Sequence, residues 1–319
     1  MKILKELLTI EKKPGKGLLA IEWVMFGYML FTLLFIFFNH KEMQNVNAMI
    51  SGRIHIAVTT LLMWGVYRMM PCRLVMLLRV IVQMAFLSWW YPDTYEMNRI
   101  LPNLDHVFAT WEQQLFGCQP ALLFSQAFSH PVFTELLDLG YAAYYPMIAA
   151  VSLYFFFRRY QDFHQCIFVI MASFFLYYAI FVIVPVTGPM FYYQAVGVDE
   201  IAKGVFPNIG DYFFSHQDCL PSPGWKDGFF YHLVESAHEA GERPTAAFPS
   251  SHVGITTVLL WLSWQARSRR LFFVLFPLFI LMFFATVYIQ AHYVIDALAG
   301  LLTGTAFYWF FRWLYAKLC

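Results

Sequence analysis

A series of long apolar runs is the feature that most constrains how this chain can fold. A helix that crosses the hydrocarbon core of a bilayer needs about 20 predominantly apolar residues. Runs of roughly that length occupy residues 18–39, 54–70, 74–91, 136–157, 163–186, 248–265, 271–289 and 294–315. We therefore predict an all-α, polytopic membrane protein with about eight transmembrane helices. The composition agrees, because 60% of the residues are hydrophobic and only 13% are charged, unlike a soluble domain.

Two polar motifs stand at the starts of late apolar runs. The first is Phe248-Pro-Ser-Ser-His-Val-Gly254, and the second is His292-Tyr-Val-Ile-Asp296. An ionisable group at the start of a membrane helix costs free energy, so each of these side chains is a functional candidate. His292 and Asp296 are four residues apart and share one face of a helix.

These residue types suit phosphoryl transfer. A carboxylate bonded to one ring nitrogen of a histidine fixes the tautomer and leaves the other nitrogen free to attack, which predicts Asp296 and His292 as an oriented nucleophile. A separate histidine, His252, could protonate a leaving oxygen and later remove a proton from an acceptor. Residues 249–251 look like a helix start, where free amides and the helix dipole suit a phosphate. Together these parts predict a phosphohistidine intermediate.

The two motifs and their spacing resemble the type-2 phosphatidic acid phosphatase superfamily, and most closely its inositol phosphorylceramide synthase-like (sphingolipid synthase) branch. The resemblance covers roughly residues 90–310 and implies a six-helix catalytic core. It implies that His252 is the acid/base, that His292 is the nucleophile and that Asp296 holds His292. No metal ion or organic cofactor is implied.

Two cationic motifs of the phosphatase members are missing here. Those members carry Lys-x6-Arg-Pro, but this chain has Phe181 at the lysine position and ends the run with Gly188-Pro189. They also carry Ser-Arg before the last histidine, where this chain has Ala285-Thr286. The sphingolipid-synthase branch lacks the same cations. Because a phosphomonoester dianion needs more positive charge than a diester, the absence favours a transferase that acts on diesters.

The leading hypothesis is a membrane lipid phosphotransferase that moves a phospho-head group from a glycerophospholipid to a ceramide-like acceptor. The resemblance alone suggests phosphoinositol as the head group. One alternative is a lipid phosphate phosphatase that uses the same triad with water, and another is a non-catalytic lipid-binding or transport protein. A zinc site made from the motif residues is a further alternative, although no additional ligand is evident. A net charge of +1 argues against a nucleic-acid partner.

The chain is predicted to divide into N-terminal membrane helices at residues 1–92 and a catalytic membrane domain at residues 93–319, with a polar outer loop at 187–247. Residues 92–131 are too polar to span and are expected to form interfacial or re-entrant helices. The histidines of the outer loop, including His238, are expected to be solvated. Arg79 lies within an apolar run, so we expect its charged group to reach the interface.

Candidate substrate contacts are Ser251, Thr187, Gly188, Pro189, Arg243 and Asp138. Ser251 could bond phosphate or simply cap its helix. The turn at 187–189 could bring its backbone close to a ligand at the glycine, or only terminate a helix. Arg243 could replace the missing cation. Asp138 needs a partner, which could be His252, a lipid hydroxyl or a neighbouring helix.

Positive charges orient the predicted helices. With a cytoplasmic N-terminus, eight spans place both motif histidines on the outer face. The cytoplasmic side then carries Lys2, Lys5, Lys12, Lys13, Lys16, Arg68, Arg73, Arg79, Arg158, Arg159, Arg267, Arg269, Arg270, Arg312 and Lys317, and the outer side Lys41, Arg53, Arg99, Lys203, Lys226 and Arg243. This bias predicts an active site on the non-cytoplasmic face. The compact chain favours a bacterial inner membrane with a periplasmic site, and a Golgi membrane with a luminal site is expected if the protein is eukaryotic.

The predicted orientation also assigns each cysteine to one side of the membrane. Cys72, Cys166 and Cys319 fall on the reducing side, whereas Cys118 and Cys219 both fall on the outer side, where a disulfide could persist. Sequence spacing says nothing about the distance between the last two, so a disulfide and two free thiols both stay open.

Overall fold

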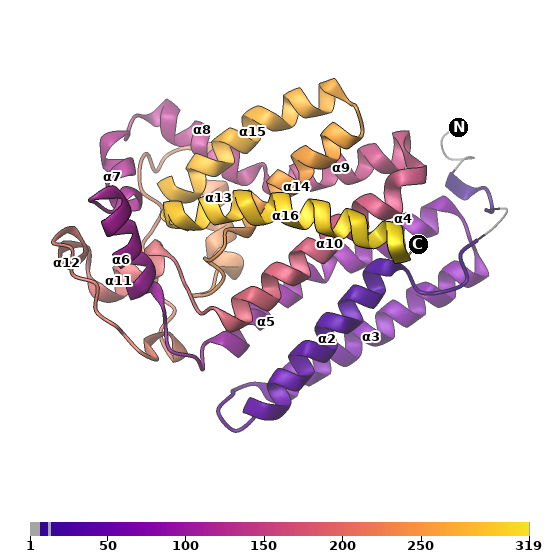
Figure 1. Ribbon diagram of the computed structural model, residues 1–319, viewed down its shortest axis with the longest axis horizontal. Helices are drawn as coiled ribbons and strands as arrows, with labels where there is room; N and C mark the ends of the chain where they lie inside the picture. Colours follow the sequence, from indigo (N-terminus) through magenta and orange to yellow (C-terminus); the bar gives the residue numbers. More distant parts are fainter. Residues whose placement is uncertain (1–6, 12–13, 319) are drawn as a thin grey trace. The chain divides into compact units, whose positions relative to one another are not determined.

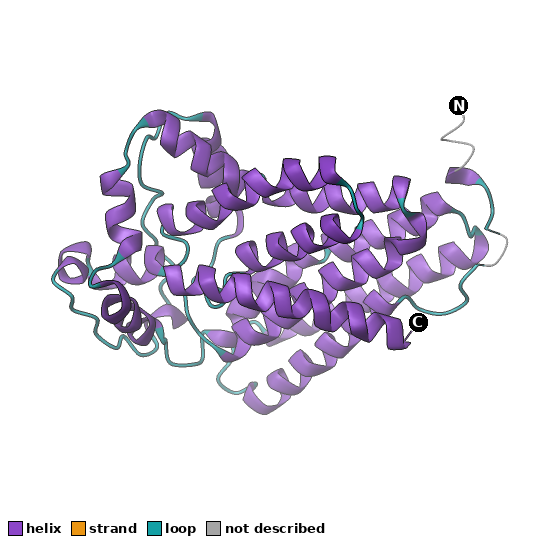
Figure 2. Ribbon diagram, turned by 45° about the horizontal axis from the view of Figure 1, so that its top comes forward, coloured by secondary structure: helices purple, strands orange, loops and turns teal. Residues whose placement is uncertain are grey.

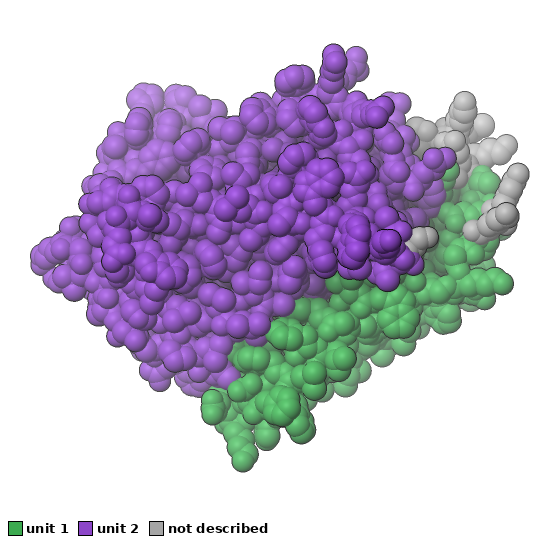
Figure 3. Space-filling model, in the orientation of Figure 1, with its two compact units in different colours: residues 1–97 green, residues 98–319 purple. Residues whose placement is uncertain are grey.

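The computed structural model describes residues 7–11 and 14–318, and the chain divides into two compact units, residues 1–97 and 98–319 (Figure 3). Helices dominate both units, and the described residues contain no β-strand beyond one isolated bridge between Ile10 and Cys72 (Figure 2). The predicted all-α class is confirmed. Five residues used in the charge and cysteine predictions lie outside the described residues: Lys2, Lys5, Lys12, Lys13 and Cys319.

The first unit consists of α2 (Ala20–Asn39), α3 (Val46–Met69), α4 (Arg73–Ala85) and most of α5 (Leu87–Asn98). Two ion pairs are buried among these helices, Arg79 with Glu22 and Arg53 with Asp93. The expectation that Arg79 reaches the interface is therefore wrong. Its guanidinium is fully buried, because the Glu22 carboxylate on α2 neutralises it inside the unit.

The second unit is built around α14 (Ser251–Gln265), which packs on α16 (Val294–Leu318), α15 (Arg269–Tyr288), α9 (Tyr144–Arg158) and α10 (Tyr160–Ile183) (Figure 1). Glycines let α14 and α16 approach closely. A Cβ added at Gly300 would lie 2.5 Å from the carbonyl oxygen of Ser250, and one at Gly304 would collide with the backbone of Gly254. The Ser250 amide also donates to the Asp296 carbonyl at 3.0 Å. This packing brings the starts of the two motif helices together.

Six helices of the described residues are long and apolar enough to cross a membrane, or up to seven if a bent pair counts as one span. That pair is α8 (Pro131–Ala142) with α9, bent by 45°. The predicted run at 248–265 forms α14, which has 15 residues and spans roughly 22 Å, short of the hydrocarbon thickness. The chain is a multi-pass membrane protein, but the predicted count of eight spans is not confirmed.

The predicted outer loop at 187–247 is more structured than expected. It contains α11 (Pro189–Val196), α12 (Val198–Ala202), a short 3-10 turn at Tyr212–Phe214 and α13 (Phe229–Gly241). The first amides of α13 donate to the Glu135 carboxylate of α8, at 3.2 Å from Phe230 and 3.0 Å from Tyr231. A side chain far away in the sequence thus caps α13 and packs it on α8.

Candidate active site

The histidines of the two motifs lie next to each other. His252 is the second residue of α14, and His292 lies in the short segment between α15 and α16. Their ring centroids are 5.7 Å apart, with an angle of 65° between the ring planes. Residues 40 positions apart in sequence are therefore placed where both imidazoles can contact one phosphate-sized group.

His292 is held in one tautomer by the backbone. Its ring is buried, and Nδ1 lies 2.8 Å from the carbonyl oxygen of Ala247. A carbonyl oxygen can only accept a hydrogen bond, so Nδ1 carries the proton and Nε2 keeps its lone pair. Burial lowers the pKa of His292 to about 4, which keeps the imidazole neutral near pH 7. The free Nε2 is thus available as a nucleophile.

Asp296 is placed differently from the sequence prediction. Its carboxylate Oδ2 lies 3.7 Å from His292 Nδ1, which is too long for a hydrogen bond. Oδ2 instead accepts a hydrogen bond from the backbone amide of Tyr293 at 2.9 Å, and Oδ1 has no partner among the described residues. The Ala247 carbonyl therefore orients the ring, while Asp296 places its carboxyl group beside it.

His252 is positioned by aromatic packing. Tyr141 stacks on its ring at a centroid distance of 4.8 Å, and Tyr144 packs at 4.5 Å on a tilted plane. Its Nδ1 has no hydrogen-bond partner within the described part of the chain. Packing thus fixes the ring without engaging this nitrogen, which leaves His252 free to exchange a proton with a ligand.

The start of α14 keeps free donors. Ser250 is the N-cap, and its hydroxyl accepts a hydrogen bond from the Val253 amide at 3.4 Å. Ser251, which could have been the cap, is instead the first helical residue and is buried. The amides of Ser251 and His252 have no hydrogen-bond acceptor among the described residues. Such amides, at the positive end of a helix dipole, suit a phosphoryl oxygen.

The turn at 187–189 is fixed by Asp105, the first residue of α6 (Asp105–Phe116). The fully buried Asp105 carboxylate accepts hydrogen bonds from the Thr187 amide and hydroxyl, at 2.7 and 2.9 Å, and from the Gly188 amide at 2.9 Å. Asn103 and the Tyr293 hydroxyl also donate to it. Burial raises the pKa of Asp105, and these donors oppose the rise. Asp105 thereby ties the turn to the segment that carries His292.

The glycine of this turn is required by close packing. Gly188 has a φ of 93°, and a Cβ there would collide with the carbonyl oxygen of Ala291. Ala247, whose carbonyl holds the His292 ring, lies 3.3 Å from the same added atom. Gly188 is therefore packed against the backbone of Ala291, the residue before His292, and beside the Ala247 side chain. The Thr187 hydroxyl instead donates to Asp105.

Glu112 is a second buried carboxylate on α6, and it caps α16. It accepts hydrogen bonds from the amides of Val294 at 2.9 Å and Ile295 at 3.3 Å, which are the first two of that helix. Neither Asp105 nor Glu112 lies in the sequence motifs that predict the site. Their spacing of seven residues, two turns on one helix face, was a signal that both point the same way.

The other residues predicted for the site or for a disulfide lie in different surroundings. The only described hydrogen bond of the Arg243 side chain goes to the carbonyl oxygen of Glu242, and no described contact joins Arg243 to either motif histidine. Asp138 is fully buried, and both of its carboxylate oxygens lack partners among the described residues. Cys118 and Cys219 are free thiols, so the disulfide is not formed.

His238 on α13 is buried, so the expectation of a solvated side chain is wrong. Its ring packs 6.0 Å from that of Tyr141, which in turn stacks on His252. Its Nδ1 lies 3.5 Å from the Glu235 carboxylate, and this interaction lowers the pKa of Glu235 to about 2. The outer segment thus contributes side chains to the wall beside His252.

Comparison with known proteins identifies related sequences and folds. The family model described as "PAP2 superfamily" matches residues 106–310, well over half of the chain. Among solved structures, a transmembrane PAP2-type phosphatidylglycerolphosphate phosphatase from Bacillus subtilis is similar, with 14% sequence identity and a TM-score of 0.38. That similarity covers 68% of this chain and 94% of the other. No curated protein sequence gives a significant match.

Proposed function

The chain belongs to the PAP2 superfamily, and we propose that it is a lipid phosphotransferase in which His292 carries the phospho-head group between two lipids. The observation that carries this proposal is the pair of histidines. Their ring centroids lie 5.7 Å apart, and His292 has its Nδ1 engaged by a carbonyl and its Nε2 free. One imidazole is thus prepared to attack phosphorus, and the other is close enough to handle protons.

The first half of the reaction forms a phosphohistidine. His292 Nε2 attacks the phosphorus of a glycerophospholipid, and the bond from phosphorus to the diacylglycerol oxygen breaks. Protonated His252 gives its proton to that oxygen, so neutral diacylglycerol leaves. The amides of Ser251 and His252 bind the phosphoryl oxygens during this step. The Asp296 carboxylate, 3.7 Å from the ring, stabilises the positive charge that develops on His292.

The second half regenerates the enzyme. His252, now neutral, takes the proton of a ceramide-like hydroxyl while that oxygen attacks phosphorus. The bond between phosphorus and His292 Nε2 breaks, which restores the neutral imidazole and the protonated His252. Phosphoinositol is proposed as the transferred group, and a sphingolipid phosphodiester is the product.

The charge around the site supports a diester substrate. The motif cations of phosphatase members are replaced by Phe181, Gly188 and Thr286, and Arg243 makes no described contact with the histidines. A phosphodiester carries one negative charge, so helix amides can bind it without a cluster of cations. Asp138, whose buried carboxylate oxygens have no partner within residues 7–11 and 14–318, lies one helical turn from the Tyr141 that stacks on His252. We propose that Asp138 accepts a hydrogen bond from a substrate hydroxyl.

We propose that the site faces the non-cytoplasmic side, the periplasm in a bacterium or the Golgi lumen in a eukaryote. Arg158 is the last residue of α9, Arg267 follows α14, and Arg269 and Arg270 begin α15, all at helix ends remote from the motif histidines. Such clusters are typical of the cytoplasmic side. Labelling of single cysteines introduced at positions 232 and 270 with an impermeant reagent in intact cells tests this. Reaction at position 270 but not at position 232 would reverse the orientation.

The activity is tested with the purified full-length protein in lipid nanodiscs. Labelled phosphatidylinositol and ceramide are supplied in one assay, and phosphatidic acid in the other. We expect transfer of phosphoinositol, and we expect His292→Ala and His252→Ala each to reduce it by at least about a thousandfold. His232→Ala, at an exposed histidine of α13, serves as the matched control and retains full activity.

Release of inorganic phosphate from phosphatidic acid without transfer would replace the transferase with the phosphatase. Turnover retained in His292→Ala with the same product would refute the nucleophile assignment. Denaturing the enzyme rapidly during turnover, at alkaline pH, should trap labelled phosphohistidine in the wild type and none in His292→Ala. A melting temperature close to that of the wild type shows that each variant is folded.

A further inference from the structure

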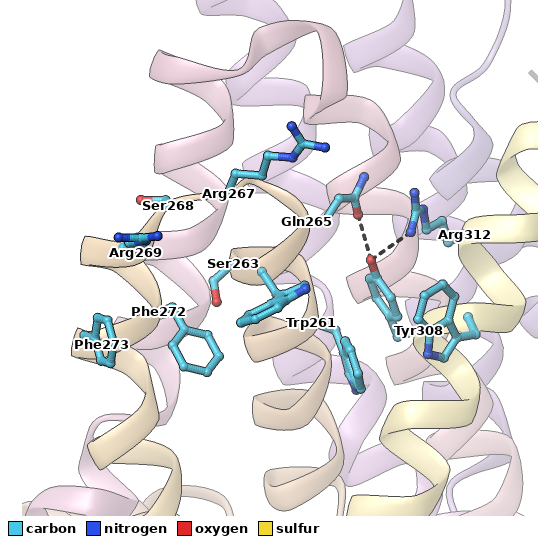
Figure 4. A pocket seen from close by; sticks show the side chains of 12 residues that line it. Trp261, Ser263, Gln265, Arg267, Ser268, Arg269, Phe272, Phe273, Tyr308 and Arg312 are labelled. Carbon is cyan, nitrogen blue, oxygen red and sulfur yellow. Dashed lines mark hydrogen bonds between the residues drawn. The ribbon is translucent and has the colours of Figure 1, made fainter.

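A second site lies at the other end of the helices that carry the catalytic candidates. A groove of about 620 Å³ is formed by the end of α14, the start of α15 and the second half of α16 (Figure 4). From His252 to Gln265 along α14 is 13 residues, or roughly 20 Å at 1.5 Å per residue. The groove is therefore at the end of α14 remote from the candidate active site.

The groove is cationic. Arg267, Arg269 and Arg312 line it, and none of its lining residues is acidic. Across residues 7–11 and 14–318, none of these three guanidinium groups forms an ion pair. Their charge is thus available to an anion. Guanidinium groups bind phosphate oxygens through paired, charge-assisted hydrogen bonds.

Aromatic rings form the rest of the wall. Figure 4 shows the arginines towards the top of the view and the rings of Trp261, Phe272 and Phe273 below them. Two further indoles that line the groove, Trp264 and Trp309, are 66% and 51% exposed. Indoles are preferred at the level of lipid head groups, where one edge is apolar and the other is wet. The groove therefore has a charged part beside an apolar part. A phospholipid has the same arrangement, with a charged head group next to apolar acyl chains.

Hydrogen bonds join the helices along one wall of the groove. The Tyr308 hydroxyl donates to the Gln265 side chain at 3.1 Å and accepts from Arg312 at 3.3 Å, which links α16 to α14. The Arg312 guanidinium lies over the Tyr308 and Trp309 rings, at 6.0 and 5.6 Å from their centroids. This arrangement holds one cation in place before any ligand arrives, which reduces the entropic cost of binding.

We propose that this groove binds an anionic phospholipid from the leaflet opposite the candidate active site. The arginines bind the lipid phosphate, and the acyl chains lie along the aromatic wall. A soluble phosphate would satisfy the arginines but leave the exposed indole and phenyl rings uncovered, so the combined surface favours a lipid. The proposal concerns binding alone, and it stands or falls independently of the phosphotransferase chemistry.

The test uses purified full-length protein in a zwitterionic detergent. Phosphatidylglycerol and phosphatidylcholine are titrated separately, and bound lipid is counted by native mass spectrometry. We expect the wild type to prefer phosphatidylglycerol. The double variant Arg267→Gln/Arg269→Gln should lose about fivefold in affinity for each charge removed, because an arginine near a lipid surface contributes about 1 kcal/mol. Lipid bound at the candidate active site contributes equally to both proteins.

Arg270→Gln is the matched control, because Arg270 is exposed beside Arg269 but does not line the groove. It should retain the preference for phosphatidylglycerol. An equal loss in Arg270→Gln would show a diffuse surface charge instead of a site. Equal binding of both lipids to the wild type would overturn the proposal, as would displacement of phosphatidylglycerol by millimolar inorganic phosphate. An unchanged melting temperature in lipid-free detergent confirms that the variants are folded.

Discussion

In the first unit the buried carboxylates of Glu22 and Asp93 each face an arginine, with nitrogen–oxygen distances of 2.6 and 3.0 Å. In the second unit the buried carboxylates of Asp105 and Glu112 face no arginine or lysine within the described residues, and they accept hydrogen bonds from backbone amides instead. Burying a carboxylate costs free energy in both units. Ion pairs with arginine offset this cost in the first unit, and hydrogen bonds from backbone amides offset it in the second.

The difference separates two uses of a buried charge. An ion pair between side chains is complete in itself and links two helices. A carboxylate that collects amides from a distant segment fixes the conformation of that segment, and here the segments are the turn at 187–189 and the start of α16. These backbones flank His292. The comparison therefore predicts that the carboxylates of the second unit control catalysis, whereas those of the first unit control only stability.

Among these buried carboxylates, Asp105 should be the one whose replacement lowers activity most, and Asp105→Asn tests this. The NH2 group of the new asparagine cannot accept a hydrogen bond. Some of the buried donors of Thr187 and Gly188 would therefore be left without acceptors. The turn would shift against Ala291 and Ala247, and a displacement of about 1 Å near reacting groups costs about a hundredfold in rate. We expect kcat to fall by that factor. Phosphatidylinositol turnover by folded protein, quantified after size-exclusion chromatography, measures it, and a rate within twofold of the wild type would contradict the positioning role.

Glu112→Gln should have a smaller effect, because one amide oxygen remains to accept from the start of α16. We expect about a fivefold loss of kcat, which corresponds to a loss of about 1 kcal/mol from the weakened helix cap. Burial raises the pKa of Glu112 from 4.5 to about 7, and the amides it binds oppose the rise. The folded state therefore favours the protonated form, and this stabilisation is present below the unfolded pKa and is lost as pH rises through about 7.

The glutamine variant cannot titrate at position 112, so this part of the pH dependence should disappear. Unfolding by denaturant, followed between about pH 5 and pH 8, compares the two proteins. The free energy of unfolding of the wild type should fall relative to that of the variant as pH rises. Parallel curves would show that Glu112 does not titrate in this range.

Part of this arrangement could be predicted from the sequence. The apolar runs predicted the helical class, and the motifs singled out His252 and His292, which the structure places side by side. The partner of His292 could not be predicted, because it is the backbone carbonyl of Ala247, and every residue has one. Asp105 was missed for a similar reason, since two of its donors are amides 82 and 83 residues away in the sequence.

The ion pair in the first unit should affect activity least. Arg79→Met leaves the Glu22 carboxylate buried without its partner, which costs about 3–5 kcal/mol of stability. Adding Glu22→Leu removes the stranded charge, so the double variant should recover most of that loss. Turnover per folded molecule should stay within about twofold of the wild type in both variants, because both residues belong to the first unit and the catalytic candidates all belong to the second. A large loss of turnover in the stable double variant would mean that the charges of the first unit also organise catalysis, and the distinction between the two uses of a buried carboxylate would fail.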